Sequence, residues 1–202
     1  VIGERSFSSD PLHVAKLGHA FVEGLHDAGM AAVGKHFPGH GGVAADSHVA
    51  LPVDDRTLAE LKARDLVPFR ELAGVLNGVM PAHVTYSAFD TRPAGFSPNW
   101  LGMLRESLGF KGCIFSDDLS MTGAHEAGGP AERAKAALAA GCDMLLICND
   151  RAAAIEVLGA CQGVLNKRPA KLRYGRARPE LDALAALGRW RRTHAKLEAL
   201  AN

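Results

Sequence analysis

Residues able to do acid–base chemistry are concentrated between Lys35 and Pro52, where the sequence reads KHFPGHGGVAADSHVALP. His36 and His40 have the i, i+4 spacing that places two zinc ligands on one face of a helix. A proline and a glycine lie between them and disfavour a helix, and no glutamate follows the first histidine. The glycines also lack the GKS or GKT ending of a phosphate-binding loop. The segment therefore favours proton transfer over a metal site or a phosphate site.

The stretch Asp46-Ser47-His48 provides a pair suited to such proton transfer. In an extended loop, the Asp46 carboxylate can accept a hydrogen bond from one ring nitrogen of His48. This contact fixes the tautomer and makes the other nitrogen more basic. Taken alone, the two residues could equally be ordinary exposed loop residues.

A second reactive group is predicted in the stretch FSDDLSM, which runs from Phe115 to Met121 and contains Asp117 and Asp118. Neighbouring residues on a strand point to opposite faces, so only one of the two carboxylates can face a site at the strand's end. One aspartate is then a candidate nucleophile and the other a structural hydrogen-bonding group. Alternatively, either could cap the following helix.

Apolar periodicity predicts four successive units of a helix followed by a strand. The predicted helices cover about 11–29, 58–73, 97–107 and 131–140, and the predicted strands cover 30–37, 74–84, 112–118 and 142–149. Each predicted strand consists of small and apolar residues up to its C-terminal end, where polar residues follow. This alternation indicates right-handed crossovers and a parallel sheet.

The polar strand ends favour an α/β barrel over an open sheet. An open doubly wound sheet gathers functional residues at one switch point, whereas a (β/α)8 TIM-type barrel gathers them from every strand tip. Four strands are half of the eight that close such a barrel. We therefore interpret 1–202 as the C-terminal half of a single catalytic barrel domain, and we expect the N-terminal half in the natural chain or in a partner.

The composition, 48% hydrophobic and 22% charged over 202 residues, is typical of a soluble globular domain. No leader or membrane span is evident, so we expect a cytoplasmic protein without membrane association. Four cysteines without zinc-site spacing are expected to be free thiols of a reducing compartment. A basic tail from about Lys167 is interpreted as the solvated face of a helix and not as a nucleic-acid site.

The motifs KHFPGHG, DSH, MPAHV, FSDDLSM and CNDR occur in this order between Gly3 and Arg151. In sequence and spacing they closely resemble the bacterial β-N-acetylhexosaminidases of glycoside hydrolase family 3, the NagZ type. The resemblance implies a retaining exo-β-N-acetylglucosaminidase that acts on muropeptides during peptidoglycan recycling in the cytoplasm. It also implies links to cell-wall biogenesis, cell shape, cell division and the cell cycle, and it implies no cofactor and no metal ion.

The same resemblance assigns roles to individual residues. Asp117 would be the nucleophile, and His48, paired with Asp46, the general acid and base. A histidine replaces the carboxylate usual in this role. The negative charge of Asp46 explains how His48 holds a proton at neutral pH. The residues expected to hold the sugar hydroxyls are Arg5, Lys35 and His36. Substrate contacts by His83 and Asn149 are predicted only from their strand-tip positions.

Three alternatives remain open at this point. The chain could be an inactive half-barrel that binds a carbohydrate or a protein. It could be a β-N-acetylglucosaminide phosphorylase, because a histidine acid/base tolerates an anionic acceptor better than a carboxylate does. The third alternative, a metal-dependent hydrolase built from His36, His40 and His48, is disfavoured by the argument above.

Overall fold

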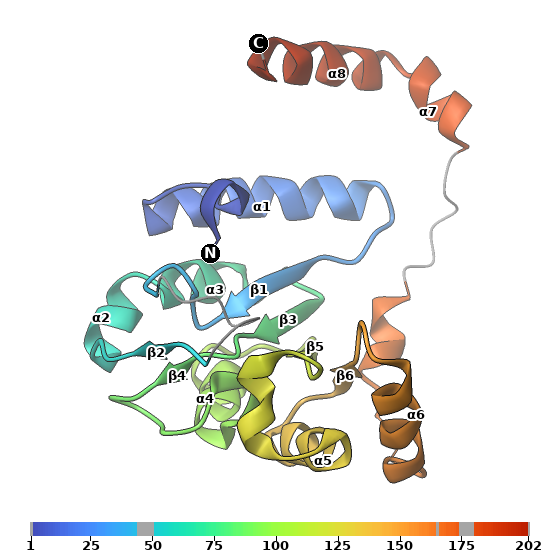
Figure 1. The fold of residues 1–202 in the computed structure, drawn as a ribbon. Coiled ribbons are helices and arrows are strands. Elements are labelled where there is room, and N and C mark those ends of the chain that lie inside the picture. Colours follow the sequence, from blue (N-terminus) through green and yellow to red (C-terminus); the bar gives the residue numbers. More distant parts are fainter. Residues whose placement is uncertain (1, 44–50, 165, 174–179, 202) are drawn as a thin grey trace.

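The structure is a computed structural model, and it describes residues 2–43, 51–164, 166–173 and 180–201. Its centre is a four-stranded parallel sheet in the order β1-β3-β5-β6. The strands are β1 (Val33–Phe37), β3 (Gly78–Pro81), β5 (Cys113–Asp118) and β6 (Met144–Leu146). Spatial order therefore follows chain order, as in one half of a TIM-type barrel (Figure 1). The predicted parallel α/β sheet is confirmed.

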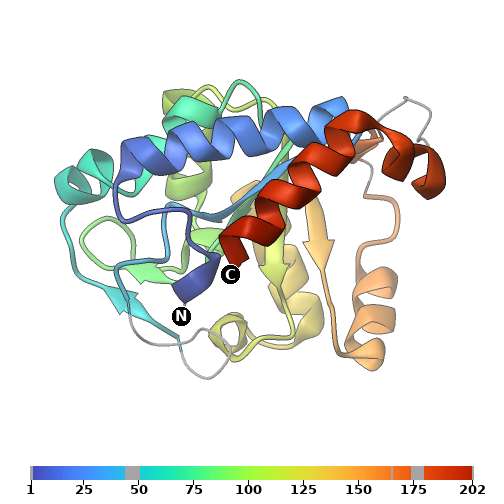
Figure 2. The same ribbon diagram turned by 90° about the horizontal axis from the view of Figure 1, so that it is seen from above.

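Helices connect the strands and pack outside the sheet (Figures 1 and 2). They are α1 (Pro11–Asp27), α2 (Leu58–Ala63), α3 (Leu66–Leu72), α4 (Pro98–Gly102), α5 (Pro130–Ala140) and α6 (Arg151–Ala160). Short 3-10 turns cover Gly3–Arg5, Ala94–Phe96, Thr122–Ala127 and Pro169–Leu172, and a π-helical turn, Met103–Ser107, extends α4. Two further short strands, β2 (Val53–Asp54) and β4 (Thr85–Tyr86), pair with each other beside the main sheet.

Local sequence signals explain where several helices begin and end. Asp10 accepts hydrogen bonds from the backbone amides of Leu12 and His13 and so caps α1, with Pro11 at its first position. Gly141, at φ +116°, ends α5 in the left-handed conformation that glycine adopts readily. The predicted helix 58–73 is in fact two helices, because the chain breaks at Arg64, whose ψ of −72° follows a φ of −127°.

Aromatic side chains form much of the core beneath the sheet. Trp100, fully buried, packs with tilted or perpendicular rings against Phe37, Tyr86 and Phe89 at centroid distances of 5.9, 5.2 and 4.5 Å. Such geometries are the favourable ones for aromatic pairs. The cluster joins β1 and β4 to α4 and so holds the strand tips in place.

The basic tail contains α7 (Leu181–Ala186) and α8 (Gly188–Ala201), which lie apart from the sheet in Figure 1. Arg189 of α8 forms an ion pair with Asp27 at the end of α1, with an N–O distance of 3.2 Å. The described side chains of α8 are exposed, in line with the predicted solvated helix. In the part of the chain that the structure describes, no helix is long and apolar enough to cross a membrane.

Asp143 is buried just before β6, at the end of the sheet opposite the C-terminal ends of the strands, and it binds several elements. Its carboxylate accepts hydrogen bonds from Arg105, from the Ile114 amide, and from Asn166 and Arg168. It therefore ties β5, the turn after α4 and the start of the tail together. A carboxylate buried to this extent is stable only when it is paired and hydrogen-bonded.

We predict that Asp143→Ala lowers the free energy of unfolding by about 3–5 kcal/mol, because it leaves the partly buried Arg105 charge uncompensated. The matched control is Asp27→Ala, which removes a surface partner of Arg189 and should change stability by at most about 1 kcal/mol. Urea denaturation followed by circular dichroism measures both. Equal losses in the two variants would contradict the role given to Asp143.

Candidate active site

The C-terminal ends of the four strands bring most of the predicted site residues to one edge of the sheet. Lys35 and His36 lie near the end of β1, and Asp117 lies near the end of β5. Asn149 is exposed shortly after β6. Segments far apart in the chain thus meet at this edge because parallel strands all point the same way.

The Asp117 carboxylate is nearly buried and lies beside His36. The residue is only 8% exposed, and its Oδ1 accepts a hydrogen bond from the Asp118 amide at 2.9 Å. Its Oδ2 lies 3.9 Å from Nε2 of His36. This distance is too long for a hydrogen bond, so the two side chains are neighbours without a direct bond.

Asp118 is engaged differently from its neighbour. Its Oδ1 accepts hydrogen bonds from the amide and hydroxyl of Ser120, at 2.9 and 2.7 Å, and from the Cys148 amide at 3.1 Å. Burial alone raises the pKa of Asp118, but these hydrogen bonds outweigh it and the pKa is lowered. The carboxylate thus serves to join the tips of β5 and β6, which is the structural role predicted for one of the two aspartates.

His36 is held in its neutral form. Burial lowers its pKa to about 4, against an opposing effect of the Asp117 charge, and the charges of Lys35 and Arg5 lower it further. Arg5, from the 3-10 turn at Gly3–Arg5, lines the same cavity as Lys35 and His36. The predicted sugar-binding group of Arg5, Lys35 and His36 is therefore brought together.

His83 lies deeper than predicted. It follows β3 but is fully buried, stacks on Phe96 at 5.4 Å, and places Nε2 3.1 Å from the Asp118 carbonyl oxygen. That carbonyl can only accept, so Nε2 carries the proton and Nδ1 has no hydrogen-bond partner among the described residues. Its side chain has no exposed surface and contacts Phe96 and the β5 backbone, and a contact between His83 and a substrate stays a prediction.

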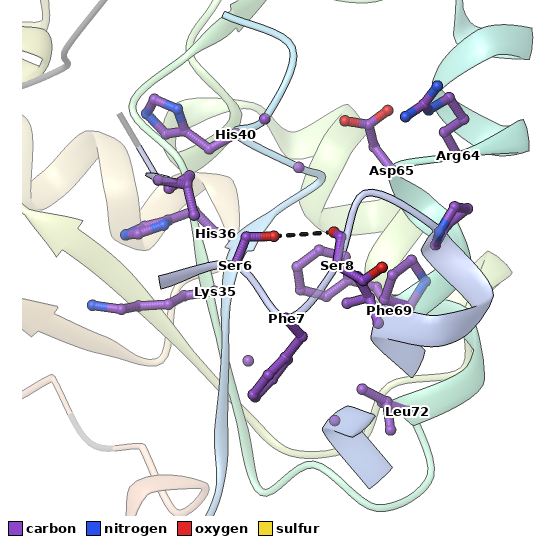
Figure 3. A pocket seen from close by; sticks show the side chains of 18 of the residues that line it. Ser6, Phe7, Ser8, Lys35, His36, His40, Arg64, Asp65, Phe69 and Leu72 are labelled. Carbon is purple, nitrogen blue, oxygen red and sulfur yellow. Dashed lines mark hydrogen bonds between the residues drawn. The ribbon is translucent and has the colours of Figure 1, made fainter. Parts of the chain in front are cut away.

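A cavity of about 990 Å³ opens beside this edge, between the N-terminal turn, α1, β1 and α3. In Figure 3, Lys35, His36 and His40 lie on one side of it, and Arg64 and Asp65 lie on the other. Asp117 does not line it, so the cavity adjoins the strand-tip site and does not coincide with it. We therefore locate the chemistry at the strand tips.

The predicted pair Asp46 and His48 lies outside the described residues. After them in the chain, Arg56 donates hydrogen bonds to both oxygens of Asp54 and of Asp65, contacts that the sequence did not predict. The ring of His40 meets that of His36 edge-on, with centroids 5.7 Å apart. Among the described residues, no group of three or more His, Cys, Asp or Glu side chains could hold a metal ion.

We predict that acidification destabilises the fold partly through His36. The unfolded chain binds a proton there near pH 6.5, but the folded chain does so only near pH 4. Stability from the neutral ring is thus fully present above about pH 6.5 and is lost as the pH falls towards 4. His36→Gln should reduce that loss by on the order of 3 kcal/mol. Urea denaturation at several pH values measures it.

The control for this pH dependence is His13→Gln, which removes an exposed histidine of α1. An unchanged pH dependence in His36→Gln, or the same change in both variants, would contradict the assignment of a neutral, buried His36.

Comparison with known proteins identifies residues 1–168 as a Glycosyl hydrolase family 3 N terminal domain. A protein named beta-hexosaminidase from Idiomarina loihiensis is 60% identical over 161 residues, which are 79% of this chain and 49% of the relative. Another beta-hexosaminidase, from Tolumonas auensis, is 53% identical over 201 residues, or 98% of this chain and 60% of the relative. The chain thus spans about half to three fifths of these relatives.

Solved structures agree with the sequence comparison. NagZ from Neisseria gonorrhoeae, in complex with N-trifluoroacetyl-D-glucosamine, aligns with a TM-score of 0.89 and 42% identity. The alignment covers 100% of this chain and 59% of the NagZ chain. The parallel order of the strands and this similarity confirm the predicted TIM-barrel type of fold, of which the chain supplies a part. On these grounds the chain belongs to glycosyl hydrolase family 3 and contains sequence of its N-terminal domain.

Proposed function

We propose that this chain contributes the nucleophile and the acid/base pair of a retaining exo-β-N-acetylglucosaminidase. The observation that carries the proposal is the arrangement of Asp117. Its Oδ2 lies beside a neutral His36 at a strand tip, and Asp118 is bound into the scaffold. The beta-hexosaminidase names of the relatives and the glucosamine derivative bound by the gonococcal NagZ support the sugar class.

In the proposed first step, Oδ2 of Asp117 attacks the anomeric carbon and forms a glycosyl ester, and the bond to the leaving oxygen breaks. His48 gives that oxygen a proton. In the second step, His48 takes a proton from water, which attacks the anomeric carbon and releases Asp117. Asp46 stabilises the imidazolium form between the two steps. Two inversions at one carbon retain its configuration.

The sugar hydroxyls are proposed to bind Arg5, Lys35 and His36. A neutral His36 can both donate and accept a hydrogen bond, which suits a hydroxyl, and Lys35 and Arg5 are donors only. His36 also leaves the negative charge of Asp117 uncompensated by a full ion pair. That preserves the nucleophilicity of the carboxylate, which a protonated histidine at 3.9 Å would reduce.

We propose muropeptides as the natural substrate class and the cytoplasm as the site of action, in peptidoglycan recycling. This part of the proposal rests on the motif resemblance. Asn149, exposed shortly after β6, is a candidate contact to the substrate. Because the chain spans only part of its relatives, the activity belongs to the complete natural polypeptide, on which the following tests are made.

We predict that a 5-fluoro N-acetylglucosaminyl inactivator esterifies Asp117, because its carboxylate faces the site. Mass spectrometry of peptides from the inactivated protein locates the adduct. Asp117→Asn should lower kcat by roughly 10⁴-fold or more, the scale seen when a covalent nucleophile is removed. An adduct on Asp118 with none on Asp117 would reverse the assignment, and inversion at the anomeric carbon would refute a covalent intermediate.

We predict that His48→Ala lowers kcat/KM for alkyl N-acetyl-β-glucosaminides by about 10²–10⁴-fold, the usual contribution of general acid catalysis. A 2,4-dinitrophenyl aglycone needs no proton, so its kcat/KM should fall far less. Equal losses for both classes would exclude the acid role.

Running the assays with and without inorganic phosphate separates hydrolysis from phosphorolysis by the identity of the product.

A further inference from the structure

His83 connects the end of β3 to the residue that follows the proposed nucleophile. Its Nε2 donates to the Asp118 carbonyl oxygen at 3.1 Å, and the Met121 amide donates to the same oxygen at 3.1 Å. A carbonyl oxygen has two lone pairs, and here one is bonded within its own turn and the other by a different segment. The His83 bond thus ties the tip of β5 to the chain that follows β3.

This bond lies where the backbone pairing of the two strands has already ended. β3 pairs with β5 at Gly78 with Cys113 and at Val79 with Ile114, and among the described residues this pairing goes no further towards the site. On the β3 side of the β5 tip, His83 therefore supplies a connection that the backbone ladder no longer makes.

The His83 ring is held so that it donates in one direction. It is fully buried and stacks on Phe96, with centroids 5.4 Å apart and an interplanar angle of 12°. Burial lowers the pKa of His83, against the opposing charge of Asp117, so the ring is neutral and carries a single N–H. That N–H is on Nε2, because the Asp118 carbonyl can only accept. The stacked ring thus fixes the direction of this carbonyl.

The backbone of Asp118 transmits the constraint to the nucleophile. Its amide donates to Oδ1 of Asp117 at 2.9 Å, so the orientation of Asp118 sets that of the neighbouring carboxylate. The other carboxylate oxygen, Oδ2, then lies 3.9 Å from Nε2 of His36. A rotation of the Asp118 backbone, released by loss of the His83 bond, would carry the Asp117 carboxylate with it.

We propose that His83 is a positioning residue for the nucleophile. By holding the Asp118 carbonyl oxygen, it keeps Oδ2 of Asp117 directed at the anomeric carbon in both chemical steps. This inference rests on the proposed glycosidase function and adds to it a residue that acts without touching the sugar. A displacement of about 1 Å in a catalytic group can lower a rate by about 10²-fold.

The test compares variants of the complete natural polypeptide. His83→Leu keeps a buried side chain but removes the N–H, and should lower kcat/KM through kcat by about 10²-fold. His83→Gln keeps an N–H donor at about the reach of Nε2 and should stay within about threefold of the wild type. The matched control is Thr85→Val, which should behave as the wild type. Thr85 is nearby and buried, and its hydroxyl has no hydrogen-bond partner among the described residues.

The loss should not depend on the leaving group, because Asp117 has to attack whichever aglycone departs. For His83→Leu, kcat/KM should therefore fall by the same factor for an alkyl and for a 2,4-dinitrophenyl N-acetyl-β-glucosaminide, unlike the pattern expected of His48→Ala. Equal losses in the leucine and glutamine variants, or a loss confined to the alkyl glycoside, would overturn the positioning role. A rise in KM at unchanged kcat would also overturn it, and would indicate a sugar contact by His83.

Trapping with the 5-fluoro inactivator separates positioning from a loss of folded protein. His83→Leu should reach the same final fraction of esterified Asp117 as the wild type, with a rate constant about 10²-fold lower. A smaller trapped fraction at an unchanged rate constant would show that the substitution only unfolds part of the protein, and it would overturn the proposal.

Phe96→Leu decides the question if His83→Leu does not fold. It keeps the histidine but removes the surface on which the ring stacks, and it should lower the trapping rate constant by about tenfold. An unchanged rate constant would refute the positioning role. Failure of the wild type to be esterified at Asp117 would instead contradict the glycosidase proposal itself, so the two failures are distinguishable.

Discussion

Parallel pairing of β1, β3, β5 and β6 is the constraint on which the rest of the structure depends, because it carries every strand's C-terminal end to the same edge. Side-chain hydrogen bonds reinforce this alignment at the C-terminal ends of the strands. The Ser116 hydroxyl accepts from the Leu146 amide at 2.9 Å, and Asp118 accepts from the Cys148 amide. His83 adds a third link, from the end of β3 to the Asp118 carbonyl oxygen. Each link joins neighbouring strand tips, so a small shift of one strand would displace the Asp117 carboxylate relative to His36.

The neighbouring aspartates divide two tasks that one carboxylate could not combine. A structural carboxylate has to spend its oxygen lone pairs on hydrogen bonds, whereas a nucleophile has to keep one oxygen available. The alternation of side chains along β5 separates the two directions, so Asp118 faces Ser120 and β6 while Asp117 faces His36. Burial keeps His36 neutral, which leaves the charge of Asp117 in place without a salt bridge. Electrostatics and strand geometry thus favour the same assignment.

The sequence sufficed for features that repeat or that depend on one element. Apolar periodicity predicts the four strands, and the alternation of side chains along a strand predicts the division of roles between Asp117 and Asp118. Contacts between separate elements could not be predicted from the sequence. The burial of His83 depends on Phe96, from the 3-10 turn Ala94–Phe96, and so could not be inferred from its strand-tip position. The break at Arg64 and the pairing of β2 with β4 were missed for the same reason, since two-residue strands carry no period. Asp46 and His48 remain predictions.

Arg56 donates paired hydrogen bonds to both Asp54 and Asp65, and this clamp is better explained by geometry than by stability. Desolvating a guanidinium and two carboxylates costs free energy that their mutual attraction only partly returns, and apolar replacements of buried ion pairs are often equally stable. A guanidinium held by two carboxylates presents a rigid planar surface against which Gly39 and Gly42 pack, and an apolar cluster would not. Gly39, together with Pro38, also disfavours a helical zinc pair in the sequence. Both conclusions follow from one physical fact, that this turn adopts its course by close backbone packing and not by helical hydrogen bonding.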